Sequence, residues 1–341
     1  MNKKIAIVIL NWNGREKGLI DKYLPSVVKY SSNAEVWVAD NGSTDDSLDF
    51  IHNNFPTVKT IALDKNYGFT GGYNRALNQI EADYFCLLND DVEVTFAWIR
   101  PIIELMESDD KIAICQPKIK SYKDKSSFEY AGAAGGYIDY LGYPFCAGRV
   151  FDSLEKDTNQ YETTREIFWA TGAAMFVKAE IFKNLGGLDE DFFAHMEEID
   201  FCWRVKNNGY KVMYCPQSTV YHYGGATLNK INPKKTYLNF RNNLLILYKN
   251  LPEKKLRSVL RKRKYMDMLA AVVFLLTTNK QEYKAVLQAR KDFYSMLPQF
   301  KEKRMKNIEK YPSCVLKKSL VLGSKLWRKN KFTDYLPQIS K

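Results

Sequence analysis

The chain has 341 residues, of which 45% are hydrophobic and 14% aromatic, so it can form one large domain with an appendage or two domains. This composition excludes a disordered protein. Its six cysteines are scattered without CxxC spacing, which argues against a disulfide framework or a zinc site and favours a reducing, cytoplasmic compartment.

The net charge of +12 conceals an asymmetry between two parts of the chain. Residues 229–341 hold 28 Lys and Arg against 7 Asp and Glu, whereas residues 1–228 hold 23 against 32. The two parts are therefore expected to meet different partners.

The first hundred residues alternate short β-branched runs with helical stretches. The opening MNKKIAIVIL imitates a signal peptide, but its apolar run breaks at NWNG, so we predict a β-strand there. Further strands are predicted in EVWVAD, VKTIAL and DYFCLL, with helices ending near Tyr30 and within TDDSLDFIHNN and TGGYNRALNQI. This rhythm is typical of an open, mostly parallel α/β sheet.

Polar residues follow three of these strands at their carboxyl ends, where ligands bind in such sheets. Two adjacent carboxylates at the end of a buried strand repel each other, so we expect a compensating partner, and a cation would be one. The alternative is an ordinary acidic loop or helix cap. One cleft could gather the whole set, which comprises Asn11, Asn13, Asp40, Asn41, Asn89, Asp90 and Asp91.

Asp40 is placed where a carboxylate can accept hydrogen bonds from a nucleotide base or a ribose hydroxyl. The alternative is a turn aspartate that bonds its own backbone. Ser43 or Thr44 is expected to cap the next helix, with Asp45 and Asp46 in its first turn as structural residues.

A glycine-rich loop, NYGFTGGYNRAL, leads into another predicted helix. It is neither a P-loop nor a GxGxxG fingerprint. Gly72 permits close approach of a ligand to the backbone, and Asn74 could bond a ligand or cap the helix.

The middle of the chain, residues 112–228, gives mixed signals. YAGAAGGYIDYLGYPF predicts turns and a mobile loop, and the next long stretch predicts a strand, a short helix from near Lys178 and a Gly-Gly turn. MEEIDFCWRVKNNGY has helical periodicity, and KVMYCPQSTVYHYGG is a last strand. The expected buried face of that helix comprises Ile199, Cys202, Trp203 and Val205.

In order along residues 4–228, VILNWNG, VADNGSTDD, NYGFTGGYN, LLNDD, WATGAAMFVKAEIF, GGLDEDFF and EEIDFCWR resemble the family-2 inverting glycosyltransferases of the GT-A fold, especially bacterial rhamnosyltransferase-like members. The resemblance implies a Rossmann-like, mostly parallel mixed sheet flanked by helices. It divides the chain into a catalytic domain, 1–228, and a basic helical extension, 229–341. Within the catalytic domain, 1–100 would bind the nucleotide and 101–228 the acceptor.

By this resemblance, NDD takes the place of the family's DXD motif. Asp91 would bind a divalent cation, Mg²⁺ or Mn²⁺, that bridges the donor's diphosphate, and Asp90 would lie near the donor ribose or sugar. Asn89 departs from the motif at its first position, which leaves open whether the metal is essential. His222, otherwise a packed or capping residue, would complete the metal site.

The resemblance also assigns the nucleotide pocket. Asn11 and Asp40 would lie near the base, and Asn66, Gly72 and Asn74 would line the rest of the pocket.

An inverting transfer needs one general base, and HMEEIDFCWR places Glu197, Glu198 and Asp200 at a helix start, where the helix dipole favours anions. The resemblance assigns the base to Glu198, where the family usually has aspartate. Glu197 and Asp200 could instead bind the acceptor or hold Arg204.

Trp169, Thr171 and Gly172 are expected on the acceptor side, with Trp169 as a core residue being the alternative.

The basic extension combines KKLRSVLRKRK with MDMLAAVVFLLTT, an apolar piece of 13 residues that is too short to span a bilayer and suits a buried or interfacial helix. Nucleic-acid binding, a solvated helical face and an anionic inner-membrane surface are the three alternatives. No nucleic-acid-binding motif is present, so we expect no nucleic acid partner and favour the membrane. The protein is then cytoplasmic and peripheral on the inner face of the membrane.

The predicted activity is inverting, metal-assisted transfer of a hexose or deoxyhexose from a UDP-, dTDP- or GDP-linked sugar to a surface glycan or lipid-linked glycan. A sugar-phosphate nucleotidyltransferase is the nearest enzyme alternative, but NWNGREKG poorly imitates the basic Gly-rich loop that it would need. A noncatalytic membrane-associated glycan or nucleic-acid binding protein would need neither acidic cluster. The oligomeric state stays open.

Overall fold

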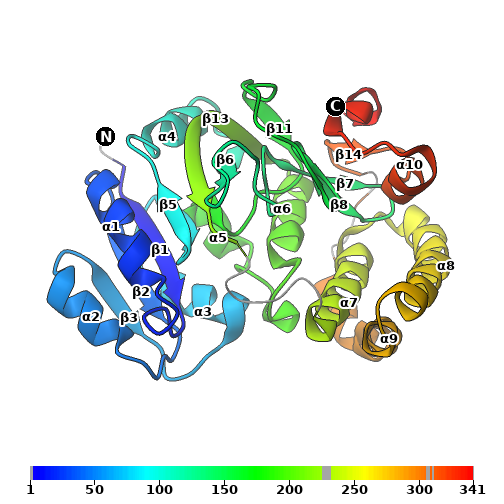
Figure 1. The fold of residues 1–341 in the computed structure, drawn as a ribbon, viewed down its shortest axis with the longest axis horizontal. Helices are drawn as coiled ribbons and strands as arrows, with labels where there is room; N and C mark the ends of the chain where they lie inside the picture. Colours follow the sequence, from blue (N-terminus) through cyan, green and yellow to red (C-terminus); the bar gives the residue numbers. More distant parts are fainter. Residues whose placement is uncertain (1–2, 225–231, 305–307, 309–310, 341) are drawn as a thin grey trace.

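The computed structural model describes residues 3–224, 232–304, 308 and 311–340 (Figure 1). Its centre is a nine-stranded mixed sheet with the order β11-β13-β6-β12-β4-β1-β2-β3, in which β5 also pairs with β13. The expected α/β fold is therefore confirmed. The four predicted N-terminal strands form and run parallel as β1 (Ile5–Asn11), β2 (Glu35–Asp40), β3 (Lys59–Ala62) and β4 (Tyr84–Asn89).

Side-chain alternation along β1 explains how the sheet is buried on both faces. Ala6 and Val8 belong to one hydrophobic cluster, whereas Ile5, Ile7 and Ile9 belong to the other. Helices cover these faces, and the three predicted ones form as α1 (Ile20–Tyr30), α2 (Ser47–Asn54) and α3 (Gly68–Leu77). A fourth, α4 (Arg100–Glu107), was not predicted.

The rest of the central sheet comes from the middle of the chain. β12 runs antiparallel between β4 and β6, so the chain reverses direction beside the strand that ends in the acidic pair. The additional strands are β5 (Val92–Val94), β6 (Ile112–Ser121), β11 (Arg165–Ile167), β12 (Ala174–Lys178) and β13 (Lys211–His222). The connecting helices are α5 (Ala179–Asn184), the 3₁₀ helix η1 (Glu190–Phe192) and α6 (Glu197–Asn207).

A second sheet replaces the mobile loop predicted around residues 130–145, and that prediction is wrong. Gly136 packs so closely on the indole of Trp169 that a Cβ would lie 2.2 Å from the ring. The Trp169 Nε1 donates to the Tyr137 carbonyl at 2.9 Å. The sheet has the order β10-β9-β8-β7-β14, from β7 (Gly136–Asp139), β8 (Pro144–Cys146), β9 (Arg149–Val150), β10 (Ser153–Leu154) and β14 (Val315–Leu316).

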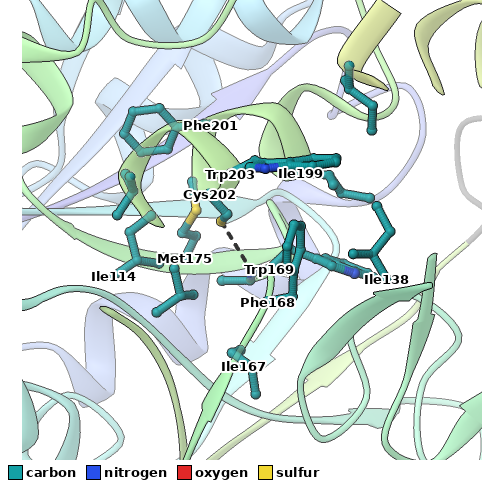
Figure 2. Close-up of a cluster of buried hydrophobic side chains, with 14 of the residues drawn as sticks. Ile114, Ile138, Ile167, Phe168, Trp169, Met175, Ile199, Phe201, Cys202 and Trp203 are labelled. Carbon is teal, nitrogen blue, oxygen red and sulfur yellow. Dashed lines mark hydrogen bonds between the residues drawn. The ribbon is translucent and has the colours of Figure 1, made fainter. Parts of the chain in front are cut away.

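Trp169 lies in the core rather than on an acceptor surface, which is the alternative left open by the sequence. Figure 2 shows it among Phe168, Ile138 and Trp203, and it is 4% exposed. The predicted inward face of α6 is also buried, and Cys202 Sγ accepts a hydrogen bond from the Ala170 amide at 3.4 Å.

The basic extension is helical, as predicted, and occupies the end of the molecule opposite α2 and β3 (Figure 1). It contributes Leu244 and Leu247 to the larger core cluster and pairs β14 with β7 in the second sheet. Charge and helix content therefore change near the predicted boundary, but one hydrophobic core contains residues from both parts of the chain. The elements are α7 (Pro233–Asn250), α8 (Glu253–Thr277), α9 (Lys280–Lys303), α10 (Leu320–Trp327), η2 (Phe332–Asp334) and η3 (Leu336–Gln338).

Within these described ranges, no helix has the length and apolar character needed to cross a bilayer.

Candidate active site

Asn11 and Asp40 meet at the carboxyl ends of β1 and β2, as the parallel register predicts. The Asn11 Nδ2 donates to Asp40 Oδ1 at 2.7 Å, and its Oδ1 accepts from the Gly14 amide at 3.1 Å. Asp40 also accepts from the Ser43 hydroxyl at 2.5 Å and the Ser43 amide at 2.9 Å. Both side chains are buried, so they shape the two loops, and direct contact with a nucleotide base stays a prediction.

The Ser43 bond to Asp40 explains why α2 begins later than predicted. Ser43 belongs to the loop network and does not cap the helix. Instead, Asp45 Oδ1 accepts from the Ser47 amide at 3.1 Å, just where the helix begins.

Asn66 supports the entrance to α3. Its Oδ1 accepts from the Gly68 amide at 2.8 Å and from Asn41 Nδ2 at 3.2 Å. The side chain is exposed, so it remains accessible to a ligand.

Gly72 and Asn74 fix the position of α3. A Cβ on Gly72 would lie 2.7 Å from Leu10 Cδ1, so glycine allows the helix to approach β1. Asn74 binds both backbone groups of Leu188, donating to the carbonyl at 2.8 Å and accepting from the amide at 2.9 Å. The structure thus gives both residues packing roles beside the predicted nucleotide pocket.

Asp91 and His222 come together at the end of β4 and β13. The His222 Nε2 lies 2.9 Å from Asp91 Oδ1, and Asp91 Oδ2 accepts from the Gly224 amide at 3.2 Å. Burial acts against charge on His222, but Asp91 and Glu129 raise its pKa to about 10. Burial likewise opposes charge on Asp91, yet His222 and hydrogen bonds bring the pKa of Asp91 below its ordinary value. The two side chains therefore form a buried ion pair.

Asp90 is half-buried beside this pair. Burial and the charge of Asp91 raise the pKa of Asp90 to about 7, while Lys17 acts in the opposite direction. The close carboxylates are thus compensated in part by His222 and Lys17, and Asp90 remains responsive to an additional cation.

Glu129 was not predicted from the sequence. Its Oε2 lies 3.3 Å from His222 Nδ1, without hydrogen-bond geometry, and it accepts from the Ala131 amide. His222 is therefore held between two buried carboxylates, one on each ring nitrogen. Such a carboxylate on the far side of a histidine fixes the direction of its other nitrogen.

Glu197 and Glu198 begin α6, and each has a buried oxygen, Oε2, without a hydrogen-bond partner among the described residues. Burial and the charge of Glu198 raise the pKa of Glu197 well above its ordinary value. Burial also raises the pKa of Glu198 to about 7. Two adjacent, poorly solvated carboxyls are suited to exchange a proton near neutral pH.

A short series of contacts connects this helix start with the acidic pair of β4. The Phe193 carbonyl accepts from the Phe69 amide at 3.2 Å, so the loop before α6 lies on the N-terminus of α3. The Phe69 ring packs against Gly172, where a Cβ would lie 2.8 Å from it. Next to Gly172, the Ala173 carbonyl accepts from the Asn89 amide at 3.0 Å. These contacts link the donor-side and base-side motifs through α3 and the segment before β12.

The loop that precedes α6 has left-handed backbone at Phe193, His195 and Met196, with φ between 63° and 74°. Asn242 of α7 is fully buried and its Nδ2 contacts the carbonyls of Phe192, Ala194 and His195 at 2.7–3.1 Å. A helix of the basic extension therefore holds the loop that positions the two glutamates.

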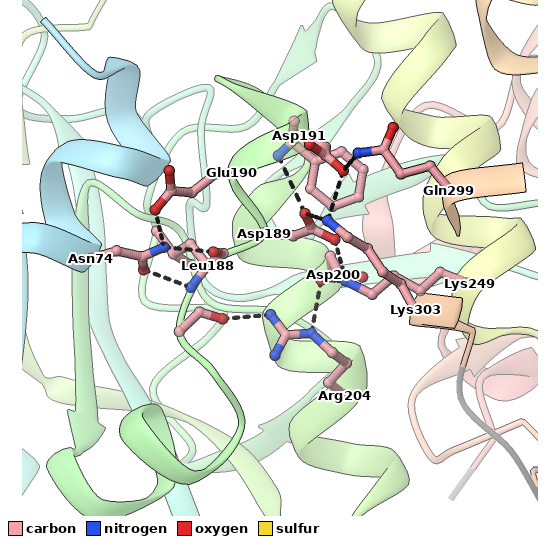
Figure 3. Close-up of polar contacts among 12 residues, drawn as sticks. Asn74, Leu188, Asp189, Glu190, Asp191, Asp200, Arg204, Lys249, Gln299 and Lys303 are labelled. Carbon is pink, nitrogen blue, oxygen red and sulfur yellow. Dashed lines mark hydrogen bonds and ion pairs between the residues drawn. The ribbon is translucent and has the colours of Figure 1, made fainter. Parts of the chain in front are cut away.

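Asp200 has a different environment from Glu197 and Glu198, and Figure 3 shows it beside Arg204 and Lys249. Its Oδ2 accepts from Arg204 Nε at 2.8 Å and Lys249 Nζ at 2.9 Å, and its Oδ1 accepts from Asn250 Nδ2 at 2.8 Å. Burial opposes its charge, but Lys249 and Arg204 bring the pKa of Asp200 down to about 2. This favours the structural alternative, in which Asp200 holds Arg204.

The same ion-pair network reaches α9. Lys249 also binds Asp189 at 2.7 Å, and Lys303 binds Asp189 at 2.6 Å and Asp191 at 2.7 Å. The GGLDEDFF motif is therefore linked by salt bridges to α7 and α9, a role that its sequence did not reveal.

Residues 6–186 match the sequence profile of glycosyl transferase family 2. The chain is 24% identical over 206 residues to an N-acetylglucosaminyl-diphospho-decaprenol L-rhamnosyltransferase of Mycobacterium tuberculosis, a match that covers 55% of this chain and 66% of that protein. It is 24% identical over 249 residues to the low-salt glycan biosynthesis hexosyltransferase Agl10 of Haloferax volcanii, covering 71% and 74%.

Solved structures share the fold at low identity. TarS 1–349 of S. aureus superposes with a TM-score of 0.56 and 16% identity, covering 89% of this chain and 83% of that chain. GalNAc-T7, crystallised with UDP, GalNAc and Mn²⁺, gives a TM-score of 0.58 and 16% identity, covering 86% and 54%. With more than half of its length matched by the family profile, the chain belongs to glycosyl transferase family 2 and is a glycosyltransferase of the GT-A fold.

Proposed function

We propose that this protein transfers a hexose or deoxyhexose, with inversion, from a nucleotide-diphosphate sugar to a glycan or lipid-linked glycan in a single displacement. The observation that carries the proposal is the pair of poorly solvated glutamates at the start of α6, which the contacts of Phe69, Gly172 and Ala173 link to the end of β4. The glutamates of α6 would supply the proton acceptor, and the acidic pair at the end of β4 would face the nucleotide-sugar donor.

Glu198 is the proposed general base. It removes the proton from the acceptor hydroxyl as that oxygen attacks the anomeric carbon from the face opposite the leaving diphosphate. Its pKa of about 7 keeps much of it deprotonated at neutral pH and still basic enough to accept a proton. Burial and the charge of Glu198 raise the pKa of Glu197 well above its ordinary value, and in its protonated form Glu197 would donate a hydrogen bond to the acceptor.

Asp91 and His222 are the proposed ligands of a divalent cation, Mg²⁺ or Mn²⁺, which would replace the proton that His222 holds in their ion pair. The described residues offer no cluster of three or more His, Cys, Asp or Glu that would enclose a metal. A pair of protein ligands nevertheless suits a cation that is shared with substrate phosphates. When bound, the metal neutralises the charge that develops on the diphosphate leaving group. Asp90 lies beside this pair and is proposed to contact the donor's ribose or sugar.

The donor is proposed to be UDP-, dTDP- or GDP-linked. TarS 1–349 has been crystallised in complex with UDP and with UDP-GlcNAc, and a mannosyltransferase from Pyrobaculum calidifontis in complex with GDP-mannose and Mn²⁺. Rhamnose is a candidate sugar because rhamnosyltransferases of Mycobacterium tuberculosis and Escherichia coli are among the relatives.

We also propose that the protein acts in the cytoplasm at the anionic inner face of the membrane. Residues 229–341 hold 28 cationic and 7 acidic residues, which supports an anionic partner. The Mycobacterium tuberculosis relative is a rhamnosyltransferase named for a decaprenol-linked acceptor.

The test is a transfer assay with each donor class and Mn²⁺, in which NMR determines the anomeric configuration of the product. Inverted product from wild type, and its loss in Glu198→Gln with intact donor binding, would support the proposal. Retained configuration would contradict the single displacement. Formation of nucleotide sugar from sugar phosphate would instead identify a nucleotidyltransferase, and binding without turnover would identify a noncatalytic protein.

A further inference from the structure

The last turns of α8 carry apolar side chains that are exposed in the described chain. Their exposed fractions lie between 37% and 78%, and side chains three or four positions apart share one face of the helix. A contiguous exposed apolar patch marks an interaction site. The patch comprises Met268, Leu269, Val272, Val273, Leu275 and Leu276.

The opposite face of α8 is firmly anchored, so the direction of this patch is fixed. Leu256, Val259 and Ala271 are buried there. Asp267 accepts from Arg263 of the same helix at 3.1 Å and from Arg290 of α9 at 2.7 Å. The apolar side chains therefore cannot turn inward without breaking a buried ion-pair network.

The preceding turns of the same helix present cations. Where α8 forms ion pairs within the described ranges, it does so through Glu253, Arg263 and Asp267, so its exposed cations stand outside these pairs. Lys262 lies 5.2 Å above the ring of Tyr140. Tyr265, 70% exposed, separates the basic half from the apolar half. The basic half comprises Lys254, Lys255, Arg257, Arg261, Lys262 and Lys264, all exposed.

We propose that this face of α8 binds the surface of an anionic lipid bilayer. The apolar turns enter the boundary between headgroups and acyl chains, and the basic turns pair with lipid phosphates. Residues 268–277 extend about 15 Å along a helix, which is half of the hydrocarbon thickness and suits insertion parallel or oblique to the surface. Tyrosine at the junction is the residue type enriched at membrane interfaces.

A second copy of the chain is a poorer occupant of the same face. Two such faces would bring cations against cations, or cations against an apolar surface, whereas a layer of lipid phosphates over acyl chains complements both halves. The proposal concerns binding and not turnover, so its test is independent of the proposed catalytic function.

The experiment is flotation of the full chain with vesicles of phosphatidylcholine alone or with phosphatidylglycerol added. Binding is expected only with the anionic lipid, and it should weaken with added salt because part of it is electrostatic. The double variant Leu269→Gln/Leu276→Gln should bind about tenfold more weakly or worse, because two leucines no longer favour the acyl region. The matched control is Phe96→Gln, an exposed apolar position (83%) outside α8, which should bind like wild type.

A second measurement reports directly whether the apolar turns of α8 enter the bilayer. All six native cysteines are buried, so Val272→Cys can be labelled selectively with an environment-sensitive fluorophore. Its emission should shift to the blue on anionic vesicles, whereas a label on the exposed Asn53→Cys of α2 should not respond. Equal binding of the double variant, or no shift at position 272, would overturn the proposal. So would a dimer in vesicle-free solution that the double variant dissociates.

Discussion

Glu198 illustrates how burial of one carboxyl couples activity to stability. In the folded protein its pKa is about 7, against an ordinary value of 4.5. Between these values the folded state holds a proton that the unfolded state releases, so the contribution of Glu198 to stability is most favourable below about pH 4.5 and is lost as the pH rises to about 7.

Replacing Glu198 by glutamine should therefore separate the two effects. Turnover should fall about 10²–10⁴-fold through loss of the base, with donor affinity near that of wild type. At pH 8 the variant should melt at a higher temperature than wild type, and the difference should vanish near pH 4. Thermal unfolding across pH, together with single-turnover kinetics, checks both outcomes. Glu197→Gln is the matched control, and if it alone abolishes turnover, the base is Glu197.

His222 depends on Glu129 for its orientation in the buried group around Asp91. Glu129→Gln preserves the shape of the side chain but removes its charge, so Mn²⁺ affinity should fall about 10–100-fold while the fold is retained. Isothermal titration with Mn²⁺ and donor measures this. Glu155→Gln, outside this group, should leave the affinity unchanged. Equal affinity in wild type and Glu129→Gln would show that Glu129 does not position a metal ligand.

Residue roles that depend on distant partners were not accessible from the sequence. The acidic pair, His222 and the glutamates stood out because each lies in a short motif beside a predicted strand or helix. Glu129 and Asn242 lie in no motif, and their roles exist only because the fold brings each of them to a segment far away in sequence. Asp200 could be seen as a partner of Arg204, but its bond to Lys249 of α7 could not.

At the scale of elements, the start of α6 is held in place by α7 and α9. Asp200→Asn leaves Lys249 and Arg204 buried with less compensating charge, and should cost about 3–5 kcal/mol of stability. Below about pH 2 the wild-type carboxylate also becomes protonated, so the difference should diminish in acid. Denaturant unfolding with a transfer assay checks this. A variant with wild-type stability and no turnover would make Asp200 a catalytic candidate again.

Long, regular strands could be predicted from the sequence, whereas very short ones could not. β1, β2 and β4 were predictable because six or seven residues carry a mostly buried apolar pattern, β-branched in β1 and β2, that ends in a polar cluster. β7 and the start of β8 lie in the glycine-rich stretch that indicated a loop, and β9 and β10 have only two residues each, too few to carry a pattern. What stabilises that sheet is packing against Trp169 and pairing with β14, neither of which is a local signal.

For the molecule as a whole, the basic extension is part of the folding unit. Deleting residues 233–341 removes buried leucines of α7, strand β14 and the hydrogen bonds from Asn242 to the loop before α6. Because each buried leucine contributes about 1.5–3 kcal/mol and whole domains are stable by about 5–15 kcal/mol, the truncated chain should not fold. Circular dichroism and limited proteolysis would show this. A truncated chain that melts cooperatively and binds donor would establish two independent domains with a boundary near 228.

The central claim is that Asp91 joins a divalent cation to a nucleotide-diphosphate donor. Its most direct test is a thermal-shift series with UDP-, dTDP- and GDP-linked sugars, each with and without Mn²⁺, on wild type and Asp91→Asn. The expected result is stabilisation of wild type by one donor class only when Mn²⁺ is present, and no such stabilisation in the variant. The same donor stabilising both proteins equally, with or without Mn²⁺, would contradict it.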